Sequence, residues 1–282
     1  MKSELTLRDR PLAETLAALQ QQVRAQPADA RLRIFLFQLL AVLGQWDRAL
    51  NQLNVSGELD ASATAMVQSY RELLRCEALR AEVFTGARTP LVFGEPEPWV
   101  ALLVESLKHV AAGRSTAAAA LRAQAFEQAP AVGGRRWPHG SPEEGPGSDG
   151  EPFEWVADAD ARLGPMLEMV VNGRYWWVPF SRIRRLDVEA PTDLRDLVWS
   201  PAHAEWTNGG EVVGFVPTRY PGSEASEDDA LRLASRTDWR DLGDETWAGL
   251  GQRLLATDGG EIGLLELGRI ELAAADGEGG RG

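Results

Sequence analysis

The hydrophobic pattern of the chain changes its period near residue 130, and this change limits the possible folds more than any other feature. Before it, apolar residues recur every three or four positions, as at Leu12, Leu16, Leu19 and Val23, which is the spacing of one helix face. After it, short β-branched or aromatic runs alternate with turn residues, which is typical of strands. The sequence therefore predicts an α+β protein in which helices precede a small, mostly antiparallel β domain.

Charge and aromatic content change at the same place. Residues 1–130 carry 14 basic and 14 acidic side chains, whereas residues 131–282 carry 15 and 28, so the net charge of −13 lies in the second half. Eight of the ten tryptophans lie there too. The segment between the halves holds twelve Gly, Pro or Ser in 21 residues, a composition with little apolar surface to bury. We predict a helical domain at 1–129, a linker or loop at 130–150, an acidic β domain at 151–272 and a disordered tail at 273–282.

Proline and glycine divide the first half into helices. Pro27 ends the first helix, and Asp29 is placed to cap the second. Gly44 ends this second helix, and Gly113 ends the helix expected over 99–110. Residues 32–43 are apolar nearly all round, which predicts a central helix with neighbours on several sides. Further helices are expected from Trp46 onward and over 66–79, 99–110 and 116–128.

The order helix, glycine, helix is the unit of tetratricopeptide arrays, whose period is about 34 residues. Gly44 and Gly113 are 69 positions apart, but the middle unit has no glycine at the expected place near 78. A tetratricopeptide-like stack is therefore predicted, with an irregular helical bundle as the alternative. A stack would form a concave groove able to accept an amphipathic helix. The candidate groove residues are Arg31, Phe35, Gln38, Tyr70 and Arg71, with core packing as the alternative role of Phe35 and Tyr70.

In the second half, Asn172-Gly173 is a hairpin-turn signal between two strand-like runs, 166–171 and 175–180. Pro179 cannot donate a ladder hydrogen bond, so the returning strand ends there or lies at an edge. Further strands are predicted at 183–188, 197–200, 204–207, 211–217, 252–256 and 262–272. Most of the eight tryptophans are expected in the core, with one or two exposed at a partner surface.

Several residue groups are candidates for metal or catalytic sites. One cysteine, Cys76, excludes an internal disulfide and, with only three histidines, a usual zinc cluster. Asp158 and Asp160 could hold Mg²⁺, although a solvated ion-pair cluster with Arg162 is the favoured interpretation. We expect Cys76 to pack inertly in a helix because no basic side chain near it in the sequence would activate its thiol.

A Ser-His-Glu arrangement is suggested by Ser200, His203 and Glu205, but closeness in sequence is not triad geometry. No nucleophile-elbow or phosphate-loop motif supports catalysis or nucleotide binding. We therefore predict no catalytic residue, no cofactor and no metal. The arginines at 182, 184 and 185 could bind an acidic or nucleic-acid surface beside Trp176 and Trp177. Local ion pairs with Asp187 and Glu189 are favoured, and the net charge excludes a generally basic nucleic-acid surface.

No apolar run is long enough to cross a bilayer, and the first residues show no secretion signal. These two observations predict a cytoplasmic protein with no membrane partner.

Seven segments of the second half stand in an order that resembles one bacterial family. They are Asp158–Glu168, Gly173–Phe180, Asp193–Trp199, Pro217–Tyr220, Arg236–Trp239, Gly249–Arg253 and Leu264–Glu266. Together they are similar to the ImpE family, also called TagJ, of accessory components of bacterial type VI secretion systems. The Gly/Pro-rich stretch before residue 150 departs from the family pattern.

The resemblance implies a non-enzymatic adaptor. Its expected partner is the small subunit of the contractile sheath, bound through that subunit's N-terminal helix. A ClpV-type AAA+ ATPase, which disassembles contracted sheaths, is a further expected partner in some systems. Two alternatives stay open. One is a β domain that binds a small molecule or hydrolyses a substrate, suggested by the many Asp, Glu, Arg and Trp residues between 158 and 253. The other is a helical scaffold whose partner lies outside secretion.

Overall fold

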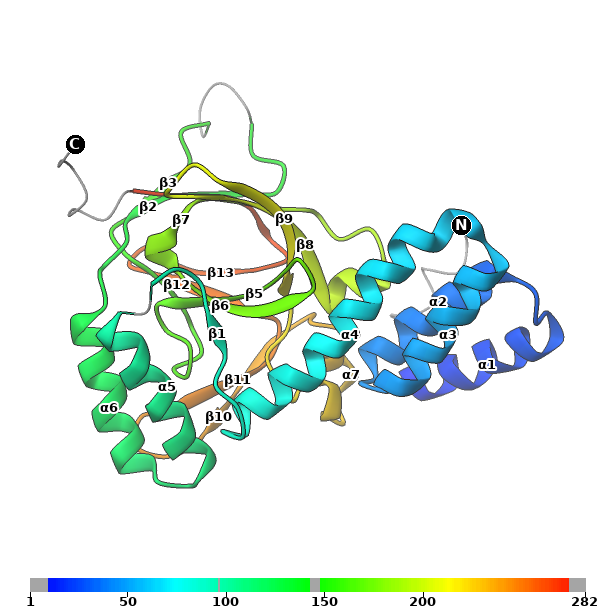
Figure 1. Ribbon diagram of the computed structural model, residues 1–282, viewed down its shortest axis with the longest axis horizontal. Coiled ribbons are helices and arrows are strands. Elements are labelled where there is room, and N and C mark those ends of the chain that lie inside the picture. The colour runs from blue at the N-terminus through cyan, green and yellow to red at the C-terminus, as the bar shows by residue number, and fades with distance from the viewer. Residues whose placement is uncertain (1–9, 96, 143–147, 274–282) are drawn as a thin grey trace.

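The computed structural model of the protein describes residues 10–95, 97–142 and 148–273. A helical part precedes a β-rich part, as the hydrophobic periods predict (Figure 1). The helices are α1 (Leu12–Ala25), α2 (Ala30–Val42), α3 (Trp46–Leu59), α4 (Thr64–Phe84), α5 (Pro98–Ala111), α6 (Ser115–Gln128) and α7 (Asp229–Arg232), with 3-10 turns η2 (Ala61–Ala63), η3 (Phe180–Arg182), η4 (Leu194–Leu197) and η5 (Ser223–Ala225).

The strands form three sheets. The largest has the order β1-β6-β5-β9-β8-β7-β14-β2-β3, and its neighbours are antiparallel except for β1 and β6. The others are β13-β12-β4 and the hairpin β10-β11. The strands are β1 (Leu91–Val92), β2 (Gly134–Pro138), β3 (Glu151–Phe153), β4 (Val156–Asp158), β5 (Met166–Val171), β6 (Arg174–Pro179), β7 (Ile183–Val188), β8 (Trp199–Trp206), β9 (Glu211–Pro217), β10 (Thr237–Asp241), β11 (Trp247–Gly251), β12 (Leu254–Thr257), β13 (Gly260–Gly263) and β14 (Leu267–Leu272).

Helix α2 begins and ends where its sequence predicts. The Asp29 side chain accepts hydrogen bonds from the backbone N–H groups of Arg31 and Leu32, at 2.8 and 3.2 Å, which satisfies donors that have no partner inside the helix. Gly44 follows the helix with φ +65°, and a Cβ there would lie 2.6 Å from the Glu224 side chain. Seven consecutive residues of α2, from Leu36 to Val42, are buried, so this helix is central as predicted.

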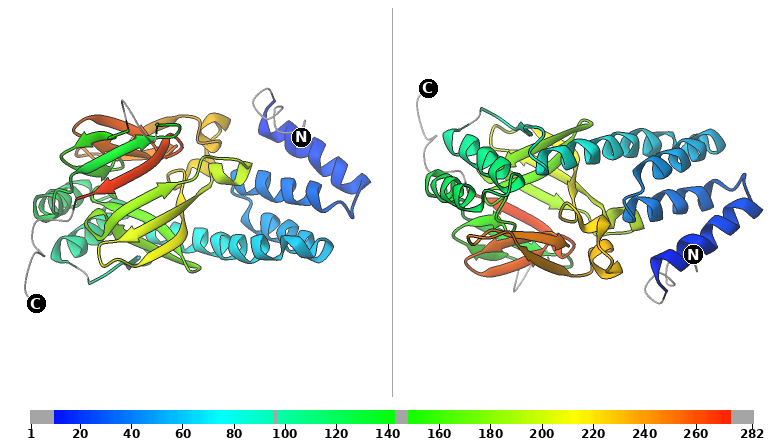
Figure 2. Two further views of the ribbon diagram at one scale, coloured as in Figure 1. Left: turned by 90° about the horizontal axis from the view of Figure 1, so that it is seen from above. Right: turned by 90° about the horizontal axis from the view of Figure 1, so that it is seen from below.

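Helices α1 to α4 pack one after another, and α4 is 21 residues long. It runs from this group along the β part toward the α5–α6 hairpin, which lies at the opposite end of the molecule (Figures 1 and 2). The tetratricopeptide-like stack stays a prediction for α1–α4, and the α5–α6 hairpin lies apart from it. None of the described helices is both long enough and apolar enough to cross a membrane.

Strand β5 lies between two hydrophobic cores, which explains why all six of its residues are buried. Met166 and Val170 belong to a core shared with the helices, whereas Leu167, Met169 and Val171 belong to a core inside the β part. Side chains alternate between the faces of a strand, so Glu168 must share the face of Met166. The helices and the large sheet are thus joined by a common core.

The predicted hairpin is present, because Asn172 and Gly173 have φ +51° and +70° between β5 and β6. The two strands predicted on either side of Pro201 are one strand, β8, because the run continues in register with β9 through that proline. The predicted strand 262–272 is interrupted instead, and its parts are β13 and β14.

Part of the predicted linker 130–150 is a strand. Gly134–Pro138 form β2, paired with β14 on one side and β3 on the other. Gly134 is needed there for close approach, since a Cβ would lie 2.1 Å from the Glu271 carbonyl oxygen. Residues 143–147 lie outside the described residues, as does the predicted disordered tail 273–282 apart from Ala273. The division into domains stays a prediction.

Fewer of the tryptophans in the second half are buried than expected. Of the eight in the second half, Trp177, Trp199 and Trp206 are buried, while Trp155 and Trp247 are exposed. The expectation that most are core residues was wrong, whereas the number exposed agrees. The reason is that several of these side chains belong to outer elements, such as the two-stranded β10–β11 hairpin that carries Trp247.

Candidate functional site

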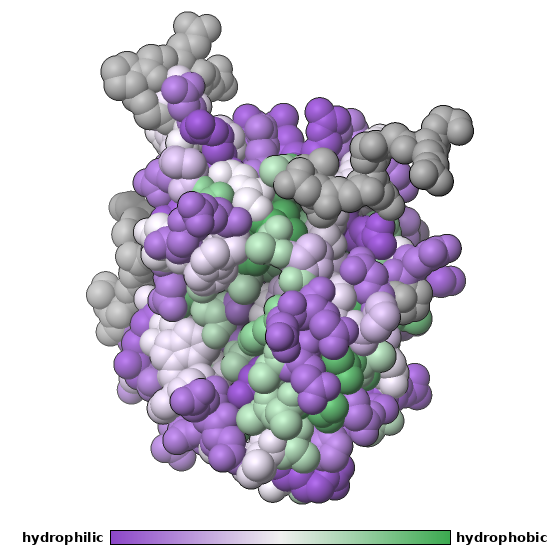
Figure 3. All heavy atoms as spheres, turned by 90° about the vertical axis from the view of Figure 1, so that its left-hand side faces the viewer, coloured by the Kyte–Doolittle hydropathy of each residue, from purple (hydrophilic) through white to green (hydrophobic). Residues whose placement is uncertain are grey.

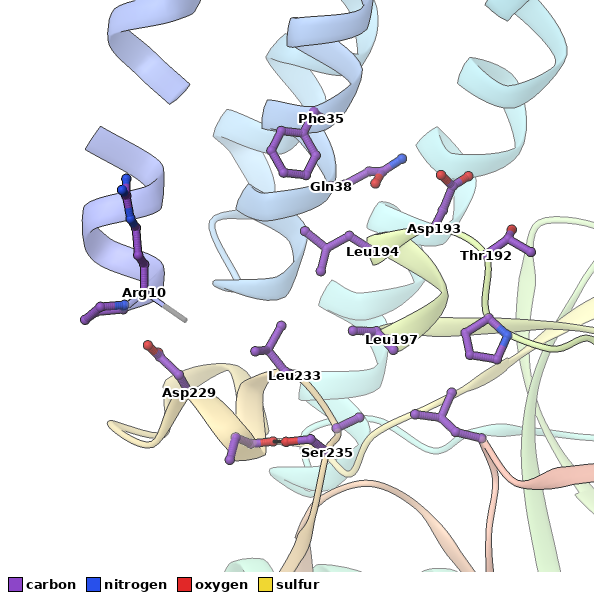
Figure 4. Close-up of a pocket in the computed structure, with 15 residues that line it drawn as sticks. Arg10, Phe35, Gln38, Thr192, Asp193, Leu194, Leu197, Asp229, Leu233 and Ser235 are labelled. Carbon is purple, nitrogen blue, oxygen red and sulfur yellow. Dashed lines mark hydrogen bonds between the residues drawn. The ribbon is translucent and has the colours of Figure 1, made fainter. Parts of the chain in front are cut away.

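A cleft of about 990 Å³ opens between the start of α1, helix α2, turn η4 and helix α7 (Figure 4). Four separate stretches of the chain, far apart in sequence, supply most of its lining. The lining residues are Arg10, Pro11, Phe35, Gln38, Pro191, Thr192, Asp193, Leu194, Leu197, Asp229, Ala230, Leu233, Ala234, Ser235 and Leu265.

The middle of the cleft is apolar and its border is polar. Phe35 from α2, Leu194 from η4 and Leu233 after α7 converge on the space (Figure 4). All three are half-buried and pack against the core that the helices share with the sheet. Each of these side chains packs against the core on one side and faces the cleft on the other, so together they form an apolar floor.

The carboxylates at the border already have partners. Asp229 accepts a hydrogen bond from the backbone N–H of Leu12 at 2.9 Å and pairs with Arg232 at 3.1 Å. Asp193 pairs with Arg195. Among the described residues that line the cleft, none is a histidine, cysteine or lysine. The Ser235 hydroxyl donates to the Ala230 carbonyl oxygen at 3.0 Å, and the Thr192 hydroxyl donates to Asp196 at 3.3 Å.

The structure brings two of the five predicted groove residues into this cleft and places three elsewhere. Phe35 and Gln38 line it, and Arg31 is exposed one helical turn before Phe35. Tyr70 is instead a core residue, which is the alternative role named for it: its ring packs against Phe37, Trp199 and Phe215. Arg71 donates a hydrogen bond to Asn54 at 2.8 Å, away from the cleft. The sequence did not predict that η4 and α7 line the cleft, because each has only four residues and so shows no helical periodicity.

A second region, which we call the buried charge cluster, consists of Arg80, Asp158, Glu168 and Arg253. All four side chains are at most 4 % exposed. Arg80 donates to both carboxylate oxygens of Glu168, at 2.7 and 2.8 Å. Arg253 donates to both Asp158 and Glu168. Removing charges from water costs several kcal/mol each. The mutual pairing offsets that cost, together with hydrogen bonds such as the one that the Tyr175 hydroxyl donates to Glu168.

The pKa values of the cluster follow from its pairing. Burial acts to raise the pKa of Glu168, but the guanidinium groups of Arg80 and Arg253 outweigh it and lower that pKa to about 2. For Asp158, burial is the stronger effect and raises its pKa to about 7, although the nearby Arg253 guanidinium acts to lower that pKa. Glu168 is therefore the firmly ionised centre of the cluster.

The Asp158-x-Asp160 pair was predicted as a solvated ion-pair cluster, and only the ion pairing was right. Asp160 is fully buried, binds the Arg162 guanidinium and accepts a hydrogen bond from the Gly249 N–H at 2.9 Å. Asp158 accepts from the Tyr220 hydroxyl and is bound by Arg253. Within residues 10–95, 97–142 and 148–273, no three His, Cys, Asp or Glu side chains gather in a way that could hold a metal ion.

The suggested Ser-His-Glu arrangement does not form. Side chains alternate along β8, so Ser200 points to the opposite face from His203. The Ser200 hydroxyl is hydrogen-bonded to that of Thr218 at 2.9 Å. The Nε2 atom of His203 instead lies 3.3 Å from the Oε2 atom of Glu211. Burial raises the pKa of the Cys76 thiol to about 12, which fits the predicted inert role.

The arginines at 182, 184 and 185 form ion pairs with Glu97, Glu205 and Asp187, respectively. Local pairing is confirmed for Asp187, while the other partners differ from the expected Glu189.

A further apolar surface lies on the α5–α6 end, where hydrophobic residues form a band between hydrophilic ones (Figure 3). Phe126 of α6 is 41 % exposed and sits over Gly164, where a Cβ would lie 2.4 Å from the ring. This surface contributes nothing to the cleft, but it offers a matched site for control substitutions.

Comparison with known proteins gives three findings. Residues 150–271 match the family model described as ImpE protein. The chain is 52 % identical over 277 residues to the type VI secretion system accessory component TagJ of Pseudomonas aeruginosa, covering 98 % of this chain and 92 % of that protein. A crystal structure of a Vibrio parahaemolyticus protein superposes with a TM-score of 0.83 at 27 % identity, covering 97 % of this chain and 98 % of the other.

Proposed function

The chain belongs to the ImpE family, and from this membership we propose that the protein is an accessory component of a type VI secretion system. The similarity to the Pseudomonas aeruginosa protein extends over both the helical and the β part. It therefore includes the residues of the cleft as well as those of the buried charge cluster. A cytoplasmic location is part of the same proposal and rests on the expectation from the sequence.

In this proposal the protein is a non-enzymatic adaptor, and the cleft is where it binds the N-terminal helix of the sheath small subunit. The observation that supports the cleft is its apolar floor of Phe35, Leu194 and Leu233 inside a polar border. An amphipathic helix presents a matching apolar stripe with polar flanks. The volume lies at the upper end of the usual range for ligand pockets, about 300–1,000 Å³, which suits several side chains of one helix face.

A ClpV-type ATPase is the second partner that we propose, on the strength of the family resemblance. The acidic β part is the proposed surface, because its excess charge would speed association with a basic partner more than it would tighten binding. Co-purification of the ATPase with the full-length protein, weakened by added salt, would support this contact.

Calorimetric titration of the full-length protein with a synthetic peptide of the sheath subunit's N-terminal helix tests the adaptor function. We expect micromolar or tighter binding with a negative heat-capacity change, because apolar surface is buried. Phe35→Ala should weaken binding about ten-fold or more, as loss of a central aromatic contact does. Phe126→Ala is the matched control, since it removes a partly exposed phenylalanine from a helix at the other end. Absence of binding by the folded wild-type protein would contradict the proposal.

A further inference from the structure

Helices α2 and α7, which form two walls of the cleft, are both contacted at their C-terminal ends by one buried arginine. Arg219 follows β9, and its side chain is 2 % exposed. Its Nη1 donates hydrogen bonds to the carbonyl oxygens of Val42 and Arg232, at 2.7 and 2.5 Å, and its Nη2 donates to that of Ala41 at 3.0 Å. Ala41 and Val42 are the last residues of α2, and Arg232 is the last residue of α7. One guanidinium therefore joins the C-terminal ends of both helices.

These carbonyl groups suit a buried cation. The last carbonyls of a helix have no intrahelical partner and carry the negative end of the helix dipole. In the part of the chain that the structure describes, no carboxylate lies within 4.0 Å of the Arg219 guanidinium. Burial lowers the pKa of Arg219 to about 10, against the opposing influence of Glu224 and Glu77. The helix carbonyls are thus its direct hydrogen-bond acceptors.

The backbone that carries Arg219 is itself held by the buried charge cluster. Arg80, which is bound to Glu168, also donates to the Arg219 carbonyl oxygen at 2.9 Å. Arg253 contacts the two residues before Arg219: its backbone N–H donates to the Thr218 carbonyl oxygen at 2.8 Å, and its Nε donates to the Pro217 carbonyl oxygen at 2.9 Å. Arg219 therefore projects from a fixed base in the β part toward two helices that wall the cleft.

Helix α7 depends on this link more than α2 does. It has only four residues, too few for a stable helix without tertiary contacts. Helix α2 has core neighbours along much of its length. Without the guanidinium, α7 would keep its contacts with α1 and η5, through Asp229 and the Arg232 side chain, and its contacts with β11. It would lose its hydrogen-bonded connection to α2 through Arg219.

We propose that Arg219 is a positioning residue that sets the separation between α2 and α7, and thereby the width of the cleft. The consequence for binding rests on the proposed function, whereas the effect on the separation of the helices does not. A preformed cleft binds more tightly than one that must be ordered by its ligand.

The direct test is the distance distribution between spin labels at Arg31, on α2, and Glu227, just before α7. Both positions are exposed, and buried Cys76 with its raised pKa should not compete for the label. We expect a narrow distribution in the otherwise wild-type protein and a broadened or shifted one in Arg219→Met, which keeps a long side chain but has no donors. Arg219→Lys, which keeps the charge and fewer donors, should be intermediate.

The same variants are then titrated, without labels, with the sheath-subunit peptide. Arg219→Met should bind about ten-fold more weakly and Arg219→Lys should recover part of the affinity. An unchanged distance distribution in folded Arg219→Met overturns the proposal. If that variant does not fold, an unchanged distribution in Arg219→Lys overturns it. A changed distribution with no peptide binding by the wild type supports the role of Arg219 and contradicts the proposed function instead.

Discussion

The buried charge cluster and the cleft differ in almost every physical property. The cluster is buried and charged, and each of its carboxylates is bound by a guanidinium. The cleft is open, with an apolar floor and a few polar groups at its border. Asp158, Glu168 and Arg253 lie in the segments that carry the family resemblance. The cleft residues Leu194 and Leu265 lie in them too, whereas the α2 and α7 walls of the cleft lie outside them.

The difference shows that the most recognisable residues of this chain form most of the buried charge cluster but only part of the cleft. A buried charge tolerates little change, because each donor and acceptor needs a partner of the right length and sign. An apolar cleft needs only suitable shape and hydrophobicity, which several residue types provide. The recognisable motifs therefore include most of the cluster at the junction of the helical and β parts, while the cleft combines motif residues of η4 with helix residues that belong to no motif.

The largest effect that separates the two regions should come from Glu168→Ala. This change leaves Arg80 and Arg253 buried without their shared carboxylate, and we expect it to lower the free energy of unfolding by about 3–5 kcal/mol. Urea denaturation of both proteins measures it. A loss below that of an ordinary surface substitution would show that the cluster does not support the fold.

The pH dependence of stability should distinguish wild type from Glu168→Gln. The pKa of Glu168 is lowered to about 2 in the folded protein, so its ionised form contributes stability above its ordinary pKa near 4.5, and this is lost as pH falls toward 2. The contribution is about 3 kcal/mol at neutral pH. The difference between the two proteins should shrink as pH falls below about 5. Asp158 adds a smaller change of its own between about pH 5 and 7, because Glu168 helps to raise the pKa of Asp158 in the wild type.

A charge placed in the cleft should change binding much more than stability. Leu194→Glu puts a carboxylate on the apolar floor, and we expect about a 30-fold loss of peptide affinity, or about 2 kcal/mol. The free energy of unfolding of the Leu194→Glu variant should fall by no more than about 1 kcal/mol, because Leu194 is half-buried. Leu91→Glu, at an exposed position of β1, is the control that should bind normally. Equal affinities of the two variants would place the peptide elsewhere.

The smallest effect is expected at Arg71. Its hydrogen bond to Asn54 lies outside the cleft, so Arg71→Ala should leave peptide affinity unchanged and lower stability by about 0.5 kcal/mol. Calorimetry and urea denaturation of the same sample measure both values. A clear loss of affinity would restore Arg71 to the binding surface and widen the site beyond the cleft.

Local patterns were enough to locate most helices and many strands. The cap at Asp29, the end of α2 before Gly44 and the Asn172-Gly173 turn depend on neighbours a few residues away. The strand at 211–217 was predicted with its observed limits. Strand β2 was missed because its glycines indicated flexibility, whereas in the folded chain they permit close approach to neighbouring strands.

The sequence by itself determined the family, the order of helices before strands and the limits of several elements. These properties follow from local periodicity and from ordered motifs. Only the tertiary structure decided that Arg80 meets Glu168 across 88 positions of the chain and that Phe35 and Leu233 face one cleft. Such meetings depend on how all the elements pack together, and no local pattern encodes them. The same packing decides that Asp158, Glu168 and Arg253 are buried while Arg236 and Asp238 of another motif are exposed, because burial is a property of the folded chain and not of a segment.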